Sequence, residues 1–552
     1  MKHRSTGGVL ALGLICLLLA PAGSAADPAV PFFTGLGSHG RAVTTKVPEA
    51  QRYFDQGLVF FYAFNHDEAI RSFQAATRLD PACAMAWWGI ATAAGPHINN
   101  PFVSEPRAKL AWEAVQEARR HAAAAAPVEQ ALIAAVERRY AAPPVADRAP
   151  LDRAYADAMR EVWRQFPADA DVGALFAEAM MNLRPWDLWT QDTRAPQPGT
   201  PEIVATLERV LELDPRHPFG LHLHIHAVEA SPDPGQARAS SDRLRGLLPG
   251  VGHLEHMPSH IDVQLGRWAE AVESNERAIA ADLAYRAAGG VPRGFIWLYN
   301  AHNRHMLAFA AMMSGRSALA LQHINAMVAE WPADFIRDYA SVVDFFYAGP
   351  MEVMVRFGRW DELLARPLPP ENLPISRALA HAARGIAHAA RGDTAAARAE
   401  QVLFTAAHGR LAPDAYYSNN AGRDVLSVAA AMLDGEILFR EGKTDAGLAR
   451  LREAVAAEAK LRYDEPPSWI IPVRHALGAA LLQVGRVQEA EQVYRDDLAR
   501  WPENGWSLFG LGRALRLQDR AVEADAVERR FRAVWRHADI ELKSSCLCQP
   551  GV

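Results

Sequence analysis

Small residues, an aromatic residue and a proline recur at fixed distances along most of this 552-residue chain. The first unit contains Gly57, Ala69, Phe73, Ala76 and Pro81, at intervals of 12, 4, 3 and 5 residues. Small residues let two helices pack closely, the aromatic ring fills the remaining gap, and proline ends the second helix. Because each unit buries its apolar face only against a neighbour, the pattern predicts a stack of helix pairs.

The spacing resembles that of the tetratricopeptide repeat (TPR), a helix–turn–helix unit of about 34 residues. The clearest further copy contains Gly478, Gly485, Ala490, Tyr494 and Pro502. The resemblance implies an all-α fold, a right-handed α-solenoid of helix-turn-helix repeats. It also implies that repeat positions 2, 5, 9, 12 and 13 line a concave groove, which binds a protein, a peptide or a small ligand.

The repeat pattern divides the chain into segments of different regularity. An irregular lead at 27–49 precedes an N-terminal array at 50–340, in which residues 104–200 are helical but degenerate. A C-terminal array is expected at 341–540, followed by a Cys-x-Cys tail at 541–552. The degenerate part either completes the solenoid or forms a separate cap.

Residues 1–26 have the parts of a secretory signal peptide. A basic start at Lys2–Arg4 precedes the apolar run Val9–Leu19 and the small residues Ser24–Ala26, an order typical of cleaved signals. The apolar run is shorter than the roughly 20 residues of a membrane-spanning helix. We therefore expect an exported protein, periplasmic or secreted, without a stable membrane span. With 58 basic against 64 acidic residues and no basic stripe, a nucleic-acid partner is not expected.

Histidine is far denser between residues 222 and 260 than elsewhere in the chain. In the TPR register, His222, His226 and Glu229 fall at groove positions 5, 9 and 12 of one repeat. The following two repeats place His253, His256 and His260 at positions 2, 5 and 9, and His302 and His305 at positions 2 and 5. Together with His475, eight of the 20 histidines occupy positions 2, 5 or 9, where about one is expected from the repeat length. His224 falls off this face.

The clustered imidazoles predict a transition-metal site. Adjacent first helices run parallel, so we expect His222 beside His256 and His226 beside His260, with four ring nitrogens around a common point. Neutral imidazole is a ligand for copper and zinc, and iron is also compatible. Glu229 is then a ligand, a partner of a ligand, or a general base. His253, His302 and His305 form an outer ring or a second site. The alternative is a metal-free polar groove that contacts a peptide.

Three functions remain open on these residues. The first is an exported TPR scaffold that binds a ligand or partner through its metal-bearing groove. The second is a metal-dependent enzyme in which Glu229 is the catalytic acid or base. The third is a copper- or zinc-handling protein with Cys546 and Cys548 as accessory thiolates, although these two cysteines also suit a local disulfide or an unstructured tail.

Overall fold

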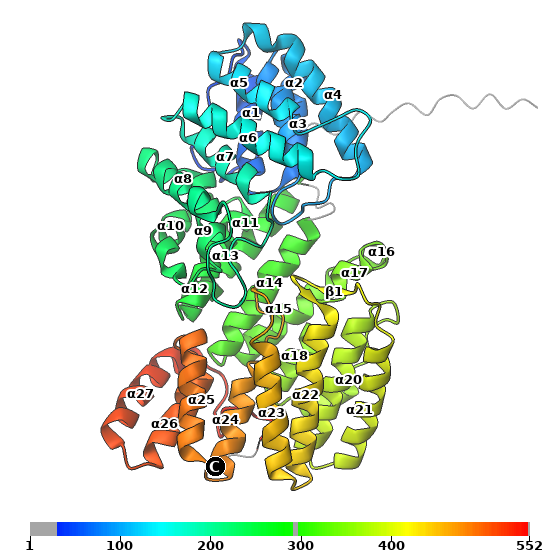
Figure 1. Ribbon diagram of the computed structural model, residues 1–552, viewed down its shortest axis with the longest axis vertical. Helices are drawn as coiled ribbons and strands as arrows, with labels where there is room; N and C mark the ends of the chain where they lie inside the picture. Colours follow the sequence, from blue (N-terminus) through cyan, green and yellow to red (C-terminus); the bar gives the residue numbers. More distant parts are fainter. Residues whose placement is uncertain (1–29, 291–295, 550–552) are drawn as a thin grey trace, which may run out of the picture.

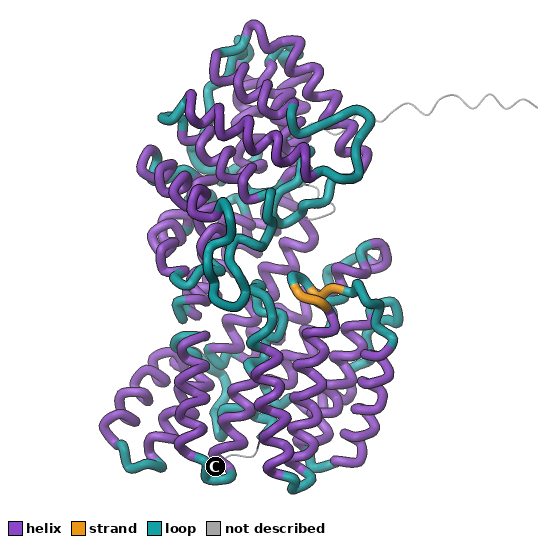
Figure 2. Tube along the Cα trace, in the orientation of Figure 1, coloured by secondary structure: helices purple, strands orange, loops and turns teal. Residues whose placement is uncertain are grey.

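The structure is a computed structural model that describes residues 30–290 and 296–549. The expected signal segment lies outside the described residues. Consecutive helices pack as antiparallel pairs that stack along the molecule (Figure 1), and helix dominates the described chain (Figure 2). The expected all-α solenoid of TPR-type repeats is confirmed. Among the described residues, none of the helices has the length and apolar character needed to cross a bilayer.

The N-terminal part of the stack contains thirteen α-helices. They are α1 (Pro48–Tyr62), α2 (His66–Leu79), α3 (Ala84–Ala93), α4 (Glu105–His121), α5 (Pro127–Glu137), α6 (Ala149–Gln165), α7 (Ala170–Met181), α8 (Thr200–Leu213), α9 (Pro218–Val228), α10 (Arg238–Leu244), α11 (Gly252–His256), α12 (Pro258–Gln264) and α13 (Trp268–Ala287). Two short 3-10 helices lie at Ala122–Ala124 and Pro234–Ala237. Helix α4 packs on α3, α6 on α7, and α7 on α8, so the degenerate segment continues the stack and does not form a separate cap.

The C-terminal part contains a second run of helices and one short strand pair. The helices are α14 (Ile296–Met313), α15 (Ser317–Ala329), α16 (Ala333–Asp338), α17 (Ala340–Val343), α18 (Gly349–Arg356), α19 (Trp360–Ala365), α20 (Pro374–Ala390), α21 (Thr394–Gly409), α22 (Gly422–Arg440), α23 (Thr444–Glu458), α24 (Val473–Gln483), α25 (Val487–Arg500), α26 (Gly505–Arg516) and α27 (Ala521–Val534). Strands β1 (Tyr416–Tyr417) and β2 (Asn420–Ala421) pair antiparallel, and a 3-10 turn lies at Trp535–His537.

The repeat spacing has a direct packing cause. Phe73 of α2 lies between Gly57 of α1 and Gly89 of α3, and a Cβ atom at either glycine would lie 2.7 or 2.6 Å from the ring. Tyr494 of α25 fills the same place against Gly478 of α24, where a Cβ atom would lie 2.5 Å from its ring. Because such distances are far inside van der Waals contact, glycine at these positions lets a large ring enter between helices.

The described residues form two hydrophobic cores. One includes buried residues from Ala50 to Tyr299, and the other includes buried residues from Val263 to Cys548. The two sets interleave in the sequence over α12 to α14, where the chain passes from the upper to the lower half of Figure 1. The histidine-bearing helices α11, α12 and α14 therefore lie at the junction of the two halves. The division of the arrays near residue 340 stays a prediction.

The C-terminal tail is folded into the inner face of the C-terminal array. The Ser545 hydroxyl contacts Tyr494 Oη at 2.7 Å and donates to the His475 carbonyl at 2.9 Å. Cys546 and Cys548 form a disulfide, and both are buried. In this form they do not offer the thiolates that the metal-handling hypothesis requires.

Candidate metal centre

Four helices bring the predicted histidines to one place. Helix α9 carries His222 and His226, the consecutive helices α11 and α12 carry the next three, and α14 carries His302. His217 caps α9, because its Nδ1 accepts a hydrogen bond from the Gly220 amide at 3.0 Å. This cap fixes where the helix begins, and therefore which face of α9 carries the imidazoles. All of these rings are buried except that of His302, which is half-buried.

The histidines form two groups of three. In each group, one ring nitrogen per residue lies within 4.8 Å of the other two: His222, His226 and His253 form the first triad, and His256, His260 and His302 form the second triad. His226, Glu229 and His260 form a further group of the same kind, which joins the triads. These groups are close enough to hold metal ions.

Hydrogen bonds to backbone and amide oxygens fix the tautomers of two rings. His222 Nδ1 lies 2.7 Å from the Tyr62 carbonyl oxygen, and His256 Nδ1 lies 2.6 Å from Asn275 Oδ1. Asn275 donates through Nδ2 to the Ala271 carbonyl at 2.8 Å, so its Oδ1 is the atom left to accept. Because these oxygens only accept, both Nδ1 atoms carry the proton, and both Nε2 atoms of the neutral rings present lone pairs.

Glu229 fixes two more rings in the same way. Its Oε1 lies 2.9 Å from His226 Nδ1, and its Oε2 lies 2.7 Å from His260 Nδ1. Glu465 Oε2 approaches His260 Nδ1 from another side, at 2.6 Å. A carboxylate on Nδ1 holds the ring orientation and leaves Nε2 for a metal, as is usual for metal-bound histidine.

The Nε2 atoms of these rings converge. His222 Nε2 lies 3.2 Å from His253 Nε2, and His256 Nε2 lies 2.6 Å from His260 Nε2. His226 Nε2 is buried and has no hydrogen-bond partner among the described residues. Two lone pairs repel at such distances, so a proton or a cation must lie between each pair.

Burial and neighbouring charges shift the pKa values of the clustered rings in opposite directions. Burial, followed by the charge of His260, lowers the pKa of His226 and of His302 to about 3. Burial opposes the charged form of His260 as well, but Glu465 and Glu229 outweigh it and raise the pKa of that ring to about 10. Burial first, and then Glu229, raises the pKa of Glu465. The metal-free cluster therefore carries one imidazolium among neutral rings, and neutral imidazole is the form that binds metals.

The expected pairing of the rings needs correction. We expected His222 beside His256, but His222 contacts His253, and His256 pairs with His260 and with His302, whose ring centroid lies 4.5 Å away. Helix α11 ends at His256 and α12 begins at Pro258. Met257 between them has helical dihedral angles, so His256 and His260 lie one turn apart on the same face. The described residues therefore hold two triads and not one four-nitrogen site.

Two predicted histidines lie outside the triads. His305 packs its ring against Phe346, with 5.5 Å between centroids, and is not part of either group. His475 Nε2 pairs with Asp497 at 2.8 Å in the C-terminal array. His224 points away from the cluster, where its Nδ1 contacts Ser240 Oγ at 2.9 Å.

Sequence reasoning missed the groups that lie behind the ligands. Tyr62 comes from α1, Asn275 from α13, and Glu465 from the segment between α23 and α24. Glu465 lies in the run Tyr463-Asp-Glu-Pro-Pro467, which has no helical periodicity to place it in the repeat register. A cluster of acidic residues beside two prolines was the available signal, and it does not point to a histidine cluster about 200 residues earlier in the chain.

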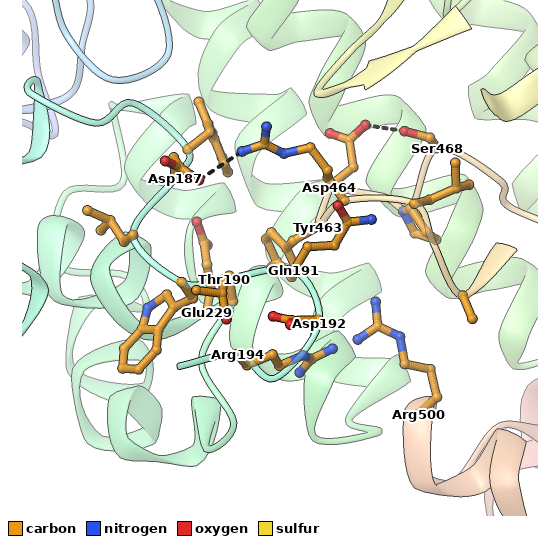
Figure 3. A pocket seen from close by; sticks show the side chains of 18 of the residues that line it. Asp187, Thr190, Gln191, Asp192, Arg194, Glu229, Tyr463, Asp464, Ser468 and Arg500 are labelled. Atoms are coloured by element: carbon orange, nitrogen blue, oxygen red, sulfur yellow. Dashed lines mark hydrogen bonds and ion pairs between the residues drawn. The ribbon is translucent and has the colours of Figure 1, made fainter. Parts of the chain in front are cut away.

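Two cavities large enough for a small ligand border the cluster, and a third, of about 30 Å³, borders His253. The larger, of about 840 Å³, is bordered by His226, His253, His260 and His302 together with aromatic residues that include Phe64 and Tyr299. The smaller, of about 430 Å³, is bordered by His226 and Glu229 and by many charged side chains (Figure 3). The centre is therefore buried within the protein but open to space of the size of a small ligand.

Comparison with known proteins gives the fold alone. No protein-family model and no curated protein matches the chain. The solved human IFIT1 dimer with PPP-AAAA is 12% identical over 86% of this chain and 89% of its own, with a TM-score of 0.32. The APC/C hetero-tetramer Cut9–Hcn1 is 12% identical (89% and 74% covered, TM-score 0.29), and yeast Tom70 is 11% identical (88% and 90% covered, TM-score 0.28). Likeness at this level carries no information on ligand, partner or activity.

Proposed function

We propose that this protein is an exported TPR-type binding protein that holds two transition-metal ions, one in each histidine triad. One observation carries the proposal: the Nδ1 atoms of four buried rings, His222, His226, His256 and His260, contact acceptors, which leaves their Nε2 atoms for a cation. Nothing in the packing of a helical repeat requires such an arrangement, and it is costly without a cation.

The spacing of the nitrogens fits a metal in the first triad, whereas the 2.6 Å between His256 Nε2 and His260 Nε2 in the second triad has to widen when a metal binds. Two ligands about 2.0–2.1 Å from one zinc ion at a tetrahedral angle lie about 3.3–3.4 Å apart. The 3.2 Å between His222 Nε2 and His253 Nε2 is close to that value. Imidazole ligands suit copper and zinc, and iron is compatible, so we propose one of these metals.

In the metal-free protein, protons lie between the paired ring nitrogens in place of the metal ions. The His260 imidazolium donates from Nε2 to His256, and a neutral His253 donates from Nε2 to His222. Metal binding through Nε2 then releases the extra proton of the His260 imidazolium, and the single proton of neutral His253 moves from Nε2 to Nδ1. The same geometry therefore gives a metal-free state that is stable enough to fold.

A metal-dependent enzyme is the second candidate, and Glu465 favours it. Each triad offers three imidazoles, which leaves coordination positions for a ligand, as in catalytic zinc sites. Bound there, a metal would supply Lewis-acid polarisation of a substrate oxygen. Both carboxylates contact imidazole nitrogens, since Glu229 bridges His226 and His260, and Glu465 Oε2 lies 2.6 Å from His260 Nδ1. Glu465 borders the larger cavity, and Glu229 is not among the residues that border it. We therefore assign Glu229 to positioning and Glu465 to acid–base catalysis.

Metal analysis of untagged protein tests the metal proposal. We expect about two equivalents per chain by mass spectrometry of the elements. His253→Ala removes a ligand of the first triad and His302→Ala a ligand of the second, so each variant is expected to lose about one equivalent. His226→Ala/His260→Ala should lose both. His224→Ala is the matched control, because His224 is a buried histidine outside both triads. Wild-type protein with no more metal than the double variant refutes the proposal.

Turnover tests the second candidate separately. A panel of chromogenic carboxylate and phosphate esters is assayed with metal-loaded protein and with Glu465→Gln. The enzyme hypothesis requires metal-dependent turnover that the variant loses while it keeps both metals. Equal rates in the two proteins would assign Glu465 a structural role.

A further inference from the structure

The smaller cavity is unusually rich in arginine. It is bordered by the loop that follows α7, the end of α9, the segment between α23 and α24, and the end of α25. Five guanidinium groups border it: Arg184, Arg194, Arg462, Arg474 and Arg500. In Figure 3 the side chains of Arg194 and Arg500 point into the cavity that Glu229 also borders.

Two of the five arginines share one carboxylate as their ion-pair partner. Asp187 Oδ2 lies 2.8 Å from Arg184 Nη1, and Asp187 Oδ1 lies 3.1 Å from Arg462 Nη2. The single carboxyl group thus bridges the loop after α7 and the segment before α24. Asp187 thus gives Arg184 and Arg462 an ion-pair partner. The other three arginines, Arg194, Arg474 and Arg500, do not contact it.

Within the described chain, none of these three arginines forms a close ion pair with a carboxylate, although the charge of Arg474 acts on the buried carboxyl groups of Glu458 and Asp497. Arg194 donates from Nη1 to the Ser231 carbonyl at 3.3 Å. Arg500 Nη1 is buried without a hydrogen-bond partner, and its guanidinium lies 4.9 Å from the Trp501 ring. A buried guanidinium nitrogen that lacks a partner is costly, and this one lies in the cavity wall.

The other carboxyl groups around the cavity are Asp192, Glu229, Glu458 and Asp464, and Glu229 is already bound to two imidazoles. Asp464 Oδ1 accepts from the Ser418 hydroxyl at 2.6 Å, and burial raises the pKa of Asp464 to about 6. Glu458 accepts from the Val473 amide at 3.2 Å, and burial raises its pKa to about 8. Asp192 is exposed. Five arginines against the carboxylates of Asp187, Asp192, Glu229 and Asp464, with Glu458 mostly protonated, leave the cavity a small excess of positive charge near neutral pH.

We propose that this cavity binds a small phosphorylated molecule, with the phosphate group held by Arg194, Arg474 and Arg500. A carboxylate is fully bound by one guanidinium fork, whereas a phosphate monoester offers three terminal oxygens and up to two negative charges. Three arginines without a carboxylate partner match that oxyanion better than they match a carboxylate. The volume of about 430 Å³ suits a small molecule. The proposal does not depend on metal in the triads.

Calorimetric titration of the full-length protein with inorganic phosphate tests the proposal. Arg474→Gln and Arg500→Gln are each expected to weaken phosphate binding at least about tenfold, because each removes a charge-assisted hydrogen bond. Arg243→Gln is the control, since Arg243 is exposed and does not border the cavity. Acetate is titrated under the same conditions as the carboxylate probe. Each titration is done with and without a chelator, and also with His226→Ala/His260→Ala.

The outcomes separate this site from the metal centre. Phosphate binding that survives chelation and the histidine variant, and that falls in both arginine variants but not in Arg243→Gln, supports the proposal. Binding lost with the metal but kept in the arginine variants means that phosphate binds the metal, and overturns it. Absence of phosphate binding, or acetate binding as tight as phosphate binding, overturns it as well.

Discussion

Replacement of Glu229 by glutamine is expected to weaken metal binding about 10- to 100-fold, or about 1.4 to 2.7 kcal/mol. Glu229 accepts from Nδ1 of both His226 and His260. A glutamine accepts from one ring through Oε1, but its amide nitrogen then faces the N–H of the other. That second ring must move its proton to Nε2, which places a proton where the metal binds and removes one ligand.

A competition titration with a chromophoric zinc chelator measures the change. Glu255→Gln is the matched control, because Glu255 is buried to the same extent, at 1% exposure for both. Glu255 pairs with Arg277 at 3.0 Å and contacts none of the clustered rings. If Glu229→Gln binds zinc as the wild type does, or if Glu255→Gln loses as much affinity, the positioning role of Glu229 is refuted.

Four further results are expected. Burial without a partner raises the pKa of Glu352 to about 8, so between pH 5 and pH 8 the folded state keeps a proton that the unfolded state releases. The free energy of unfolding of the wild type therefore falls as the pH rises. In urea unfolding, the free energy of unfolding of Glu352→Gln relative to that of the wild type should rise by up to about 4 kcal/mol over this range. Gly478→Ala should lose about 1–3 kcal/mol in the same assay, because its Cβ would lie 2.5 Å from the Tyr494 ring. Chelation should lower the free energy of unfolding by about 2.7 kcal/mol per site, relative to free metal at a hundred times the dissociation constant. Amino-terminal sequencing of exported protein should start at Asp27, and an intact Met1 would refute cleavage.

Much of the fold could be predicted from the sequence because packed helix pairs require small and aromatic residues at a repeated spacing. Gly57 and Phe73 are spaced as they are because one ring has to enter between two helices. The C-terminal tail has no repeated spacing of this kind. Its burial depends on individual contacts such as that of Ser545 with Tyr494, which could not be predicted from a periodic pattern.

The location of the site could be predicted, but its internal geometry could not. The repeat register placed His226, Glu229 and His260 on facing helices, and the structure has them in one group. The pairing of His222 with His253 and not with His256 depends on how α9 and α11 pack against each other, which counting along a regular repeat does not give. Glu465 joins the site from the segment between α23 and α24, which has no place in the repeat register.

The most direct test of the two-triad metal centre is anomalous X-ray diffraction from crystals of the metal-loaded protein, collected at the metal absorption edge. The proposal predicts two peaks. One should lie about 2.0–2.3 Å from Nε2 of His222, His226 and His253, and the other at the same distance from Nε2 of His256, His260 and His302. No peak at either triad, or a peak bound through the Nδ1 atoms, would contradict it.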